Sequence, residues 1–160
     1  MSNSSGASAH KGSTAATRRM ARHYAMQGLY QWQMAGASIN VIEAEFRTDN
    51  DMKNVDVEYF HEILHGVPQH LSDVEALFSP HLVDRALNEL DPVTQALLRM
   101  ATYEFKFRMD VPYKVVINEA VSLAKKFGAE DSHKFINGVL DKTAAVVRAI
   151  EVNADRGARR

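Results

Sequence analysis

The chain has 160 residues, enough for one domain with a sizeable core or for two small subdomains that share one. It contains no cysteine, which excludes disulfide bonds and cysteine-ligated zinc, and no apolar run approaches the roughly 18 residues of a membrane span. Its net charge of −1 is unevenly distributed, because residues 1–42 carry four basic and no acidic side chains, whereas the rest carries 15 basic and 20 acidic ones. This basic end predicts an anionic partner. The N-terminus also lacks the apolar segment of a signal peptide, so we expect a cytoplasmic protein without a membrane anchor.

The N-terminal half of the chain predicts helices. Residues 1–13 are rich in serine, glycine and alanine and lack hydrophobic periodicity, so we expect a disordered tail. Pro68 lies inside a strongly periodic segment, and because proline cannot donate the i→i−4 hydrogen bond, we expect a kink or a break near Gly66. Apolar side chains at intervals of three and four residues predict helices over 15–35, 39–46 and 56–78.

The segment after this region also predicts helices. Asp91 followed by Pro92 is a favourable helix start, since aspartate is a good N-cap and proline suits the first helical position. Residues 103–111 alternate between apolar and polar as a strand would, but no partner strand is predicted nearby. We therefore predict helices over 81–90 and 92–108, and a disordered polar tail over 153–160.

Residues 110–143 predict two amphipathic helices joined by a glycine turn. Pro112 suits the first turn, and Gly128 closes the first helix at a position that usually requires a positive φ. Asp131 lies at the positive end of the second helix, whose apolar stripe continues to Ile150. Since no convincing strand remains, the predicted fold is all-α with about seven helices.

The polar side of this hairpin is the first candidate binding surface. Phe135 lies one residue off the apolar stripe. One interpretation is a solvated face with one partly covered aromatic ring, and the other is a platform on which an unpaired RNA base stacks among phosphate-binding cations. The sequence leaves both open. The polar side chains expected around Phe135 are Lys125, Lys126, His133, Lys134 and Asn137.

Three arginines near the start of the first predicted helix form the second candidate surface. Arg18 and Arg22 are four residues apart and share a helix face, and Arg19 lies beside it. Cations at a helix N-terminus oppose the helix dipole, and a bound polyanion would relieve that repulsion. The alternative is an exposed first turn without a ligand.

His61 to His65 match the zinc-binding pattern H-E-x-x-H, with Glu62 as the general base and His70 as an offered third ligand. The same helix uses its apolar stripe for packing, so we interpret the histidines as residues at the stripe edge and predict no metal site. Asp131, Ser132 and His133 diverge on a helix and cannot form a catalytic relay, so we expect them to cap it. The sequence predicts no catalytic residue, no cofactor and no small-molecule substrate.

Two separated segments resemble the NusB family of bacterial transcription antitermination factors. DVPYKVVINEAVSLAKKFGAEDSHKFINGVLDK is similar to its C-terminal signature, and RRMARHYAMQGLYQWQ is similar to its arginine-rich first helix. The likeness extends from about Thr17 to Arg148. It implies a helical RNA-binding domain over 14–152, built from two packed helical subdomains at about 14–79 and 80–152, that is not an enzyme.

The resemblance also implies partners. Proteins of this family bind boxA, a short single-stranded RNA element of ribosomal RNA leaders, jointly with the ribosomal protein NusE, in an RNA polymerase antitermination complex with other Nus factors. Tyr30 and Glu89 match positions of the NusE-docking surface. The positions that match RNA contacts are Arg18, Arg19, Arg22, Arg99, Tyr113, Lys134, Phe135 and Asn137, with Asp131 nearby.

The chain departs from the family pattern at three positions and in its extended N-terminal tail. Met20 replaces a third consecutive arginine, Thr94 stands where an acidic partner contact is common, and Pro68 is unusual. The first departure removes one phosphate contact, and the second changes part of the expected NusE interface. The alternative to an RNA-binding factor is a helical protein–protein adaptor that does not contact RNA itself.

Overall fold

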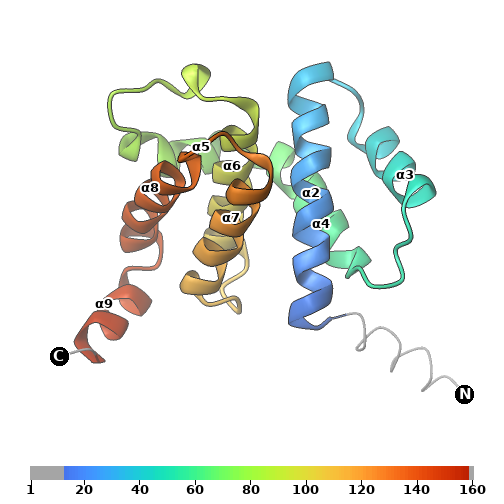
Figure 1. Cartoon of the computed structure of the whole chain (residues 1–160). Coiled ribbons are helices and arrows are strands. Elements are labelled where there is room, and N and C mark those ends of the chain that lie inside the picture. The colour runs from blue at the N-terminus through green and yellow to red at the C-terminus, as the bar shows by residue number, and fades with distance from the viewer. Residues whose placement is uncertain (1–12, 159–160) are drawn as a thin grey trace, which may run out of the picture. The chain divides into compact units, whose positions relative to one another are not determined.

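The computed structural model describes residues 13–158 (Figure 1). This part of the chain contains eight α-helices, two short 3₁₀ helices and no strand, which confirms the all-α prediction with one helix more than expected. None of these helices is long and apolar enough to cross a membrane. The elements are α2 (Ala15–Ala35), α3 (Ile39–Asp49), α4 (Val57–Gln69), α5 (Leu71–Phe78), η1 (Ser79–His81), η2 (Leu87–Glu89), α6 (Pro92–Phe107), α7 (Tyr113–Phe127), α8 (Ser132–Val147) and α9 (Ala149–Ala158).

The chain divides into two compact units, with the boundary between Gly66 and Val67. Unit 1 holds α2, α3 and most of α4, and unit 2 holds α5 to α9 with both 3₁₀ helices. The sequence placed the division near Ser79, after α5. The packing assigns α5 to unit 2 instead, because α5 contacts α6 and α8.

Helix α2 has well-defined ends. Thr14 Oγ1 accepts from the Thr17 N–H at 3.1 Å and Thr17 Oγ1 accepts from the Thr14 N–H at 2.8 Å, a reciprocal capping box. Gly36 ends the helix with φ +66°, a conformation that favours glycine, and its N–H donates to the Trp32 carbonyl. The predicted helix 15–35 is confirmed.

Gly28 lies where the three helices of unit 1 approach closely. A Cβ atom at this position would lie 2.8 Å from Leu64 Cδ1 on α4 and 3.4 Å from Ile42 Cγ2 on α3. Both neighbours are buried in the core, so neither side chain has free space to move into. The glycine is therefore required by packing rather than by its backbone conformation.

We expect Gly28→Val to lower the free energy of unfolding by about 1–3 kcal/mol, because two branched carbons must displace Leu64 and Ile42. Gly138→Ala on α8 is the matched control, since a Cβ there meets no atom within 4 Å. Removing a helical glycine at that open site should stabilise the protein by about 0.5–1 kcal/mol. Urea denaturation measures both, and equal effects of the two substitutions would contradict the packing argument.

Unit 2 is built around α6, α7 and α8, which pack on one another, while α5 and α9 both pack on α8. Asp91 caps α6, accepting from the Thr94 N–H at 3.0 Å and from the Thr94 hydroxyl at 2.7 Å, and Pro92 occupies the first turn. The predicted helix start at Asp91 and Pro92 is confirmed.

Arg148 is the largest fully buried polar side chain of unit 2 and joins the ends of several elements. Its guanidinium donates to the carbonyl oxygens at the C-terminal end of α6 and in the following loop, and to one carboxylate on α9. These acceptors are Glu104 O at 3.2 Å, Phe105 O at 2.7 Å, Arg108 O at 2.9 Å, Val111 O at 3.0 Å and Glu151 Oε1 at 2.6 Å. The last turn of a helix has carbonyls without intrahelical donors, and Arg148 supplies donors there.

Two predictions in the middle of the chain are corrected: the helix predicted over 56–78 is split as expected but at another residue, and the helix predicted over 81–90 is not formed. The break after Pro68 falls at His70 and not near Gly66, because α4 keeps its helical path to Gln69. The predicted helix 81–90 is irregular apart from His81 at the end of η1 and the 3₁₀ turn η2, and Asp84 adopts φ +58°. A left-handed residue in this position is incompatible with a continuous α-helix.

The hairpin prediction is confirmed in its two helices and corrected in its details. Gly128 has φ −87°, so it is not a left-handed residue, but a Cβ there would collide with Ser132 Oγ and lie 2.7 Å from the Ala124 carbonyl oxygen. Asp131 adopts φ +66° and its side chain does not cap α8. The last buried residue of α8 is Ala144 and the helix ends at Val147, whereas Ile150, on α9, is 89% exposed.

The C-terminal segment differs from the prediction. Helix α9 continues to Ala158, whereas the sequence predicted a disordered tail over 153–160. The prediction failed because the polar composition of this segment gives no sign that α9 packs on α8. Residues 159–160 lie outside the described part. The predicted N-terminal tail, 1–13, also lies outside it apart from Ser13, which is exposed.

Candidate nucleic-acid interface

The three arginines of α2 occupy different environments in unit 1. Arg18 places its guanidinium carbon 4.6 Å from the centre of the Tyr59 ring and its Nε 3.7 Å from Asp56 Oδ2. Arg22 lies 5.3 Å from the same ring and is only 3% exposed. Arg19 is exposed. A cation over an aromatic face is attracted by the ring quadrupole, so Arg18 and Arg22 hold α2 against α4 through Tyr59.

Phe135 in unit 2 lines an open hollow of about 350 Å³. Its ring is half-buried, and the guanidinium carbon of Arg85 lies 4.9 Å from the ring centre. Lys134 is 72% exposed and forms a weak ion pair with Asp131 at 3.4 Å. We call this site the Phe135 hollow, and its lining residues are His81, Val83, Asp84, Arg85, Lys134, Phe135, Gly138, Val139 and Lys142.

Sequence reasoning missed three basic members of this hollow. Lys142 follows Phe135 by seven residues, which places both on one helix face, so helical spacing could have found it. His81 and Arg85 come from the segment between α5 and α6, which was predicted to be a helix. Because that segment is irregular, no periodicity indicates that Arg85 reaches the Phe135 ring.

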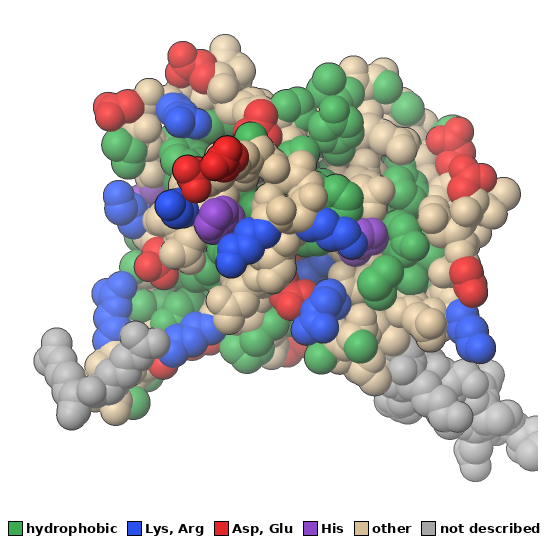
Figure 2. Space-filling view, in the orientation of Figure 1, with side chains coloured by type: hydrophobic (Ala, Val, Ile, Leu, Met, Phe, Trp, Pro, Cys, Tyr) green, Lys and Arg blue, Asp and Glu red, His purple; other side chains and the backbone are tan. Residues whose placement is uncertain are grey.

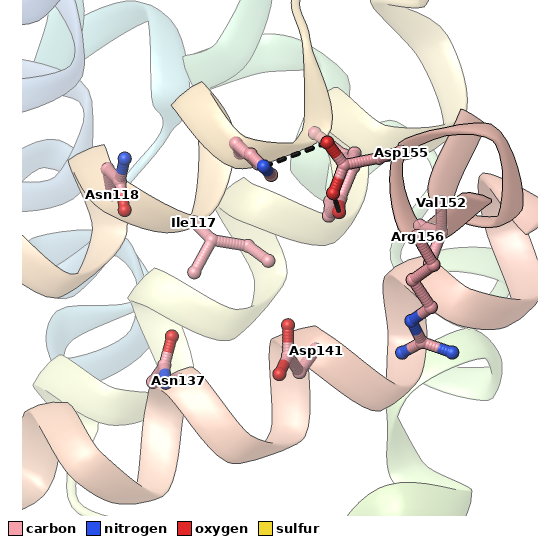
Figure 3. A pocket seen from close by; sticks show the side chains of 9 residues that line it. Ile117, Asn118, Asn137, Asp141, Val152, Asp155 and Arg156 are labelled. Atoms are coloured by element: carbon pink, nitrogen blue, oxygen red, sulfur yellow. Dashed lines mark hydrogen bonds and ion pairs between the residues drawn. The ribbon is translucent and has the colours of Figure 1, made fainter. Parts of the chain in front are cut away.

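Tyr113 and Asn137 do not line the Phe135 hollow but share a second one, of about 410 Å³ (Figure 3). The Tyr113 hydroxyl donates to Asp155 Oδ2 at 3.1 Å, and Lys114 Nζ lies 2.9 Å from Asp155 Oδ1. Asn137 and Asp141 project from the same side of α8 toward α7 (Figure 3). The structure therefore divides the predicted surface of the hairpin between two hollows.

The second hollow has a mixed electrostatic character. Its charged lining residues are Lys114, Asp141, Asp155 and Arg156, two basic and two acidic. The Phe135 hollow has three lysine and arginine side chains against the single acidic residue Asp84, together with His81. A phosphate backbone is attracted to positive potential, so the Phe135 hollow is the better site for a nucleic acid.

The remaining predicted contact, Arg99, forms a salt bridge within unit 2. Its Nε and Nη2 donate to Glu75 Oε2 at 3.0 and 2.6 Å, and the side chain is 11% exposed. This pair joins α6 to α5. On the visible face, lysine and arginine side chains lie among acidic and apolar groups (Figure 2). Local arrangement around one aromatic ring, rather than bulk charge, distinguishes the candidate site.

Comparison with known proteins decides the family. The sequence pattern of the NusB family matches residues 19–145. The chain belongs to the NusB family. A "Transcription antitermination protein NusB" from Teredinibacter turnerae is 68% identical over 143 residues, which is 89% of this chain and 97% of that protein.

Solved structures agree with the NusB fold. NusB from T. maritima superposes with a TM-score of 0.71 at 34% identity, covering 79% of this chain and 89% of that one. The structure described as "Antitermination Factors NusB and NusE in complex with dsRNA" contains a chain with a TM-score of 0.72 at 23% identity, covering 83% of this chain and 99% of that one. At that identity the likeness concerns the fold.

The positions of this NusB-family chain that were predicted to meet a protein partner lie in different units. Tyr30, on α2, is 38% exposed. Glu89, in unit 2, is exposed, and its Oε1 accepts from the Ala86 N–H at 2.6 Å. Thr94, at one of the departures from the family pattern, is 2% exposed and serves the cap of α6. A side chain buried in a helix cap offers no partner contact.

The H-E-x-x-H segment of α4 meets a residue that the sequence prediction did not consider. Glu43 Oε1, on α3, accepts from His61 Nδ1 at 2.8 Å and from His65 Nε2 at 2.6 Å. Burial raises the pKa of Glu43, but the hydrogen bonds from His65 and His61 and the charges of His61 and Arg47 outweigh this effect, so its pKa lies below the ordinary value. His70 is not part of this group of ligand atoms.

Proposed function

We propose that this protein is a transcription antitermination factor that binds boxA single-stranded RNA together with the ribosomal protein NusE and promotes processive transcription of ribosomal RNA operons. The observation that carries the proposal is the Phe135 hollow, an accessible aromatic ring among cations, in a chain that belongs to the NusB family. Stacking platforms flanked by phosphate-binding cations are the usual means of binding unpaired bases.

In unit 2 the proposed role of each residue follows from the exposure and position of its side chain. Phe135 offers its ring face to a base, and Arg85, which already lies over that ring, extends the platform by cation–π contact. Lys134 and Lys142 are exposed and neutralise phosphates. Tyr113 and Asn137 belong to the second hollow, where Asn137 presents an amide to a base edge. Arg99 pairs with Glu75 and Asp131 pairs with Lys134, so their proposed role is to position these charged side chains.

In unit 1 the phosphate contact is assigned to Arg19. It is the exposed arginine of the three, whereas Arg18 and Arg22 pack on Tyr59 and set the position of α2. Tyr30 on α2 and Glu89 in unit 2 are the proposed contacts to NusE. The factor is cytoplasmic, joins RNA polymerase with other Nus factors, and works by binding alone, without catalysis or cofactor.

The test is fluorescence anisotropy of a labelled boxA RNA titrated with the protein, with and without NusE, at two salt concentrations and with a scrambled RNA as control. Selective, salt-sensitive binding that NusE tightens supports the proposal. Equal affinity for both RNAs, or none, in every condition contradicts it. A complex with NusE in the absence of any RNA affinity would favour the protein–protein adaptor.

Arg19→Ala should weaken boxA binding and lower the slope of log K against log salt concentration by about 0.7, the value for one phosphate contact on a single strand. The matched control is Arg47→Ala, an exposed arginine of unit 1 whose Nη2 lies 2.6 Å from Glu43 Oε2. Its salt slope should equal that of the unmodified protein. An unchanged slope for Arg19→Ala would remove this residue from the RNA interface.

A further inference from the structure

Glu43, His61 and His65 form a cluster in unit 1 that the proposed RNA and NusE contacts do not use. The carboxylate comes from α3 and the two imidazoles from successive turns of α4. The three ligand atoms, one from each residue, all lie within 4.8 Å of one another. The imidazole rings are stacked with their centres 4.1 Å apart. We call this group the Glu43 cluster.

The nitrogen atoms of the Glu43 cluster converge on one point instead of facing solvent separately. His61 directs Nδ1 and His65 directs Nε2 at the same oxygen, Glu43 Oε1. Histidines four residues apart share a helix face, and a carboxylate from a facing helix completes a set of three ligands. Two imidazoles and one carboxylate are a ligand set that zinc and related divalent ions accept.

The second oxygen of Glu43 is held by a neighbour. Arg47 Nη2 lies 2.6 Å from Glu43 Oε2, so this contact fixes the plane of the carboxylate and leaves Oε1 for the imidazoles. Outer contacts of this kind orient the ligands of protein metal sites. The Arg47 side chain is 46% exposed, which lets solvent screen its charge.

From this geometry we propose that the Glu43 cluster binds a divalent transition-metal ion, zinc above all, and that the ion clamps α3 to α4. Ligand atoms about 2.0–2.1 Å from zinc in a tetrahedral site lie roughly 3.3 Å apart. The two present nitrogen–oxygen distances, 2.8 and 2.6 Å, need to open by less than an ångström. His61 is 53% exposed, so its ring has room to move and a hydrated ion has a path to the site.

The role assigned to the ion is structural. Three protein ligands from two helices add a link between α3 and α4, which also pack on each other through Phe46 and Phe60. Binding of the ion to the folded form stabilises that form by mass action. The imidazoles bind through nitrogen lone pairs, so each ring carries its remaining proton on the other nitrogen. A water molecule completes the tetrahedron on the exposed side.

The experiment uses the full chain without an affinity tag, since a histidine tag would bind the same ions. Zinc is titrated by calorimetry, and cobalt is titrated with visible absorption as a report on its coordination geometry. We expect one equivalent of either ion. At a zinc concentration about 100-fold above the dissociation constant, the unfolding temperature should rise by roughly 5 °C or more.

Three variants test the ligands. Glu43→Gln keeps the size of the side chain and removes its charge, and His61→Ala and His65→Ala each remove one imidazole. Each should weaken zinc binding at least about tenfold and lower the increase in unfolding temperature at the same zinc concentration by about half or more. Circular dichroism without metal verifies that the variants fold. His81→Ala, in unit 2, is the matched control and should bind zinc like the unmodified protein.

Two results would overturn the proposal. One is the absence of saturable zinc and cobalt binding by the unmodified chain. The other is a zinc affinity that is unchanged in Glu43→Gln, His61→Ala and His65→Ala, or that is lost in His81→Ala, because either would place the ion on other side chains. These outcomes do not depend on RNA binding, so they leave the proposed function untouched.

Discussion

Arg148→Met should lower the free energy of unfolding by about 2–5 kcal/mol, the largest stability effect expected in unit 2. Methionine fills most of the space but donates no hydrogen bond, so the carbonyl groups of Phe105 and Val111 lose the guanidinium at 2.7 and 3.0 Å. A buried polar group left without its partner costs about 1–3 kcal/mol. Replacing both partners of a buried pair can be neutral, but backbone carbonyls cannot be removed by substitution.

The measurement is urea denaturation followed by circular dichroism, with Arg156→Met as the control. Arg156 lies on α9 and is exposed, so its substitution should change the free energy of unfolding by less than about 0.5 kcal/mol. If Arg148→Met changed the free energy of unfolding as little as Arg156→Met, the Arg148 guanidinium would not be what joins the end of α6 to α9. Glu151→Gln should fall between the two, since the Glu151 side chain is 38% exposed and glutamine keeps one acceptor oxygen for Arg148.

The sequence predicts the helices of this protein well where one face is apolar and the ends carry local signals. Helix α2 has its capping threonines and Gly36, and α6 has Asp91 and Pro92. These signals act within a few residues, so they can be recognised without tertiary structure. The C-terminal helix α9 lacks such a pattern, because Val152 is its buried residue and the rest is polar.

The candidate site is predicted less completely, because it depends on contacts between segments distant in the chain. Phe135 and Lys134 are neighbours and were found together. Arg85 reaches the Phe135 ring from an irregular loop, and Glu43 reaches His61 and His65 from another helix. Helical periodicity contains no information about either contact. The pattern H-E-x-x-H points to a pair of imidazoles, while the third member of the cluster emerges only from the packing of α3 on α4.

Burial also separates residues that the sequence treats as equivalent. Arg18, Arg19 and Arg22 form one basic cluster along the chain, but a helix turns by about 100° per residue, so consecutive side chains face different surroundings. Arg22 is 3% exposed and Arg19 is exposed. The resemblance to the NusB family grouped all three as RNA contacts, and the individual roles remain predictions that the Arg19 variant tests.

The largest effect on function is expected from Phe135→Ala, which should weaken boxA RNA binding by about 5- to 150-fold, equivalent to about 1–3 kcal/mol for one lost base stack. The substitution removes the ring that lines the Phe135 hollow and over which Arg85 lies at 4.9 Å. Phe135→Tyr keeps the aromatic face and should retain affinity within about threefold. Anisotropy with labelled boxA RNA measures both.

The matched control for this variant is Phe107→Ala. Phe107 is also half-buried in unit 2, with Lys106 Nζ 5.9 Å from its ring centre, but it packs on Tyr103 and His70 and does not line the Phe135 hollow. Its loss should reduce stability without changing RNA affinity. If both alanine variants bound boxA RNA equally well, Phe135 would not be a stacking platform. If both variants lost RNA affinity in proportion to their loss of stability, Phe135 would affect binding only through folding. A direct contact with RNA instead predicts that Phe135→Ala loses more affinity than its loss of stability explains.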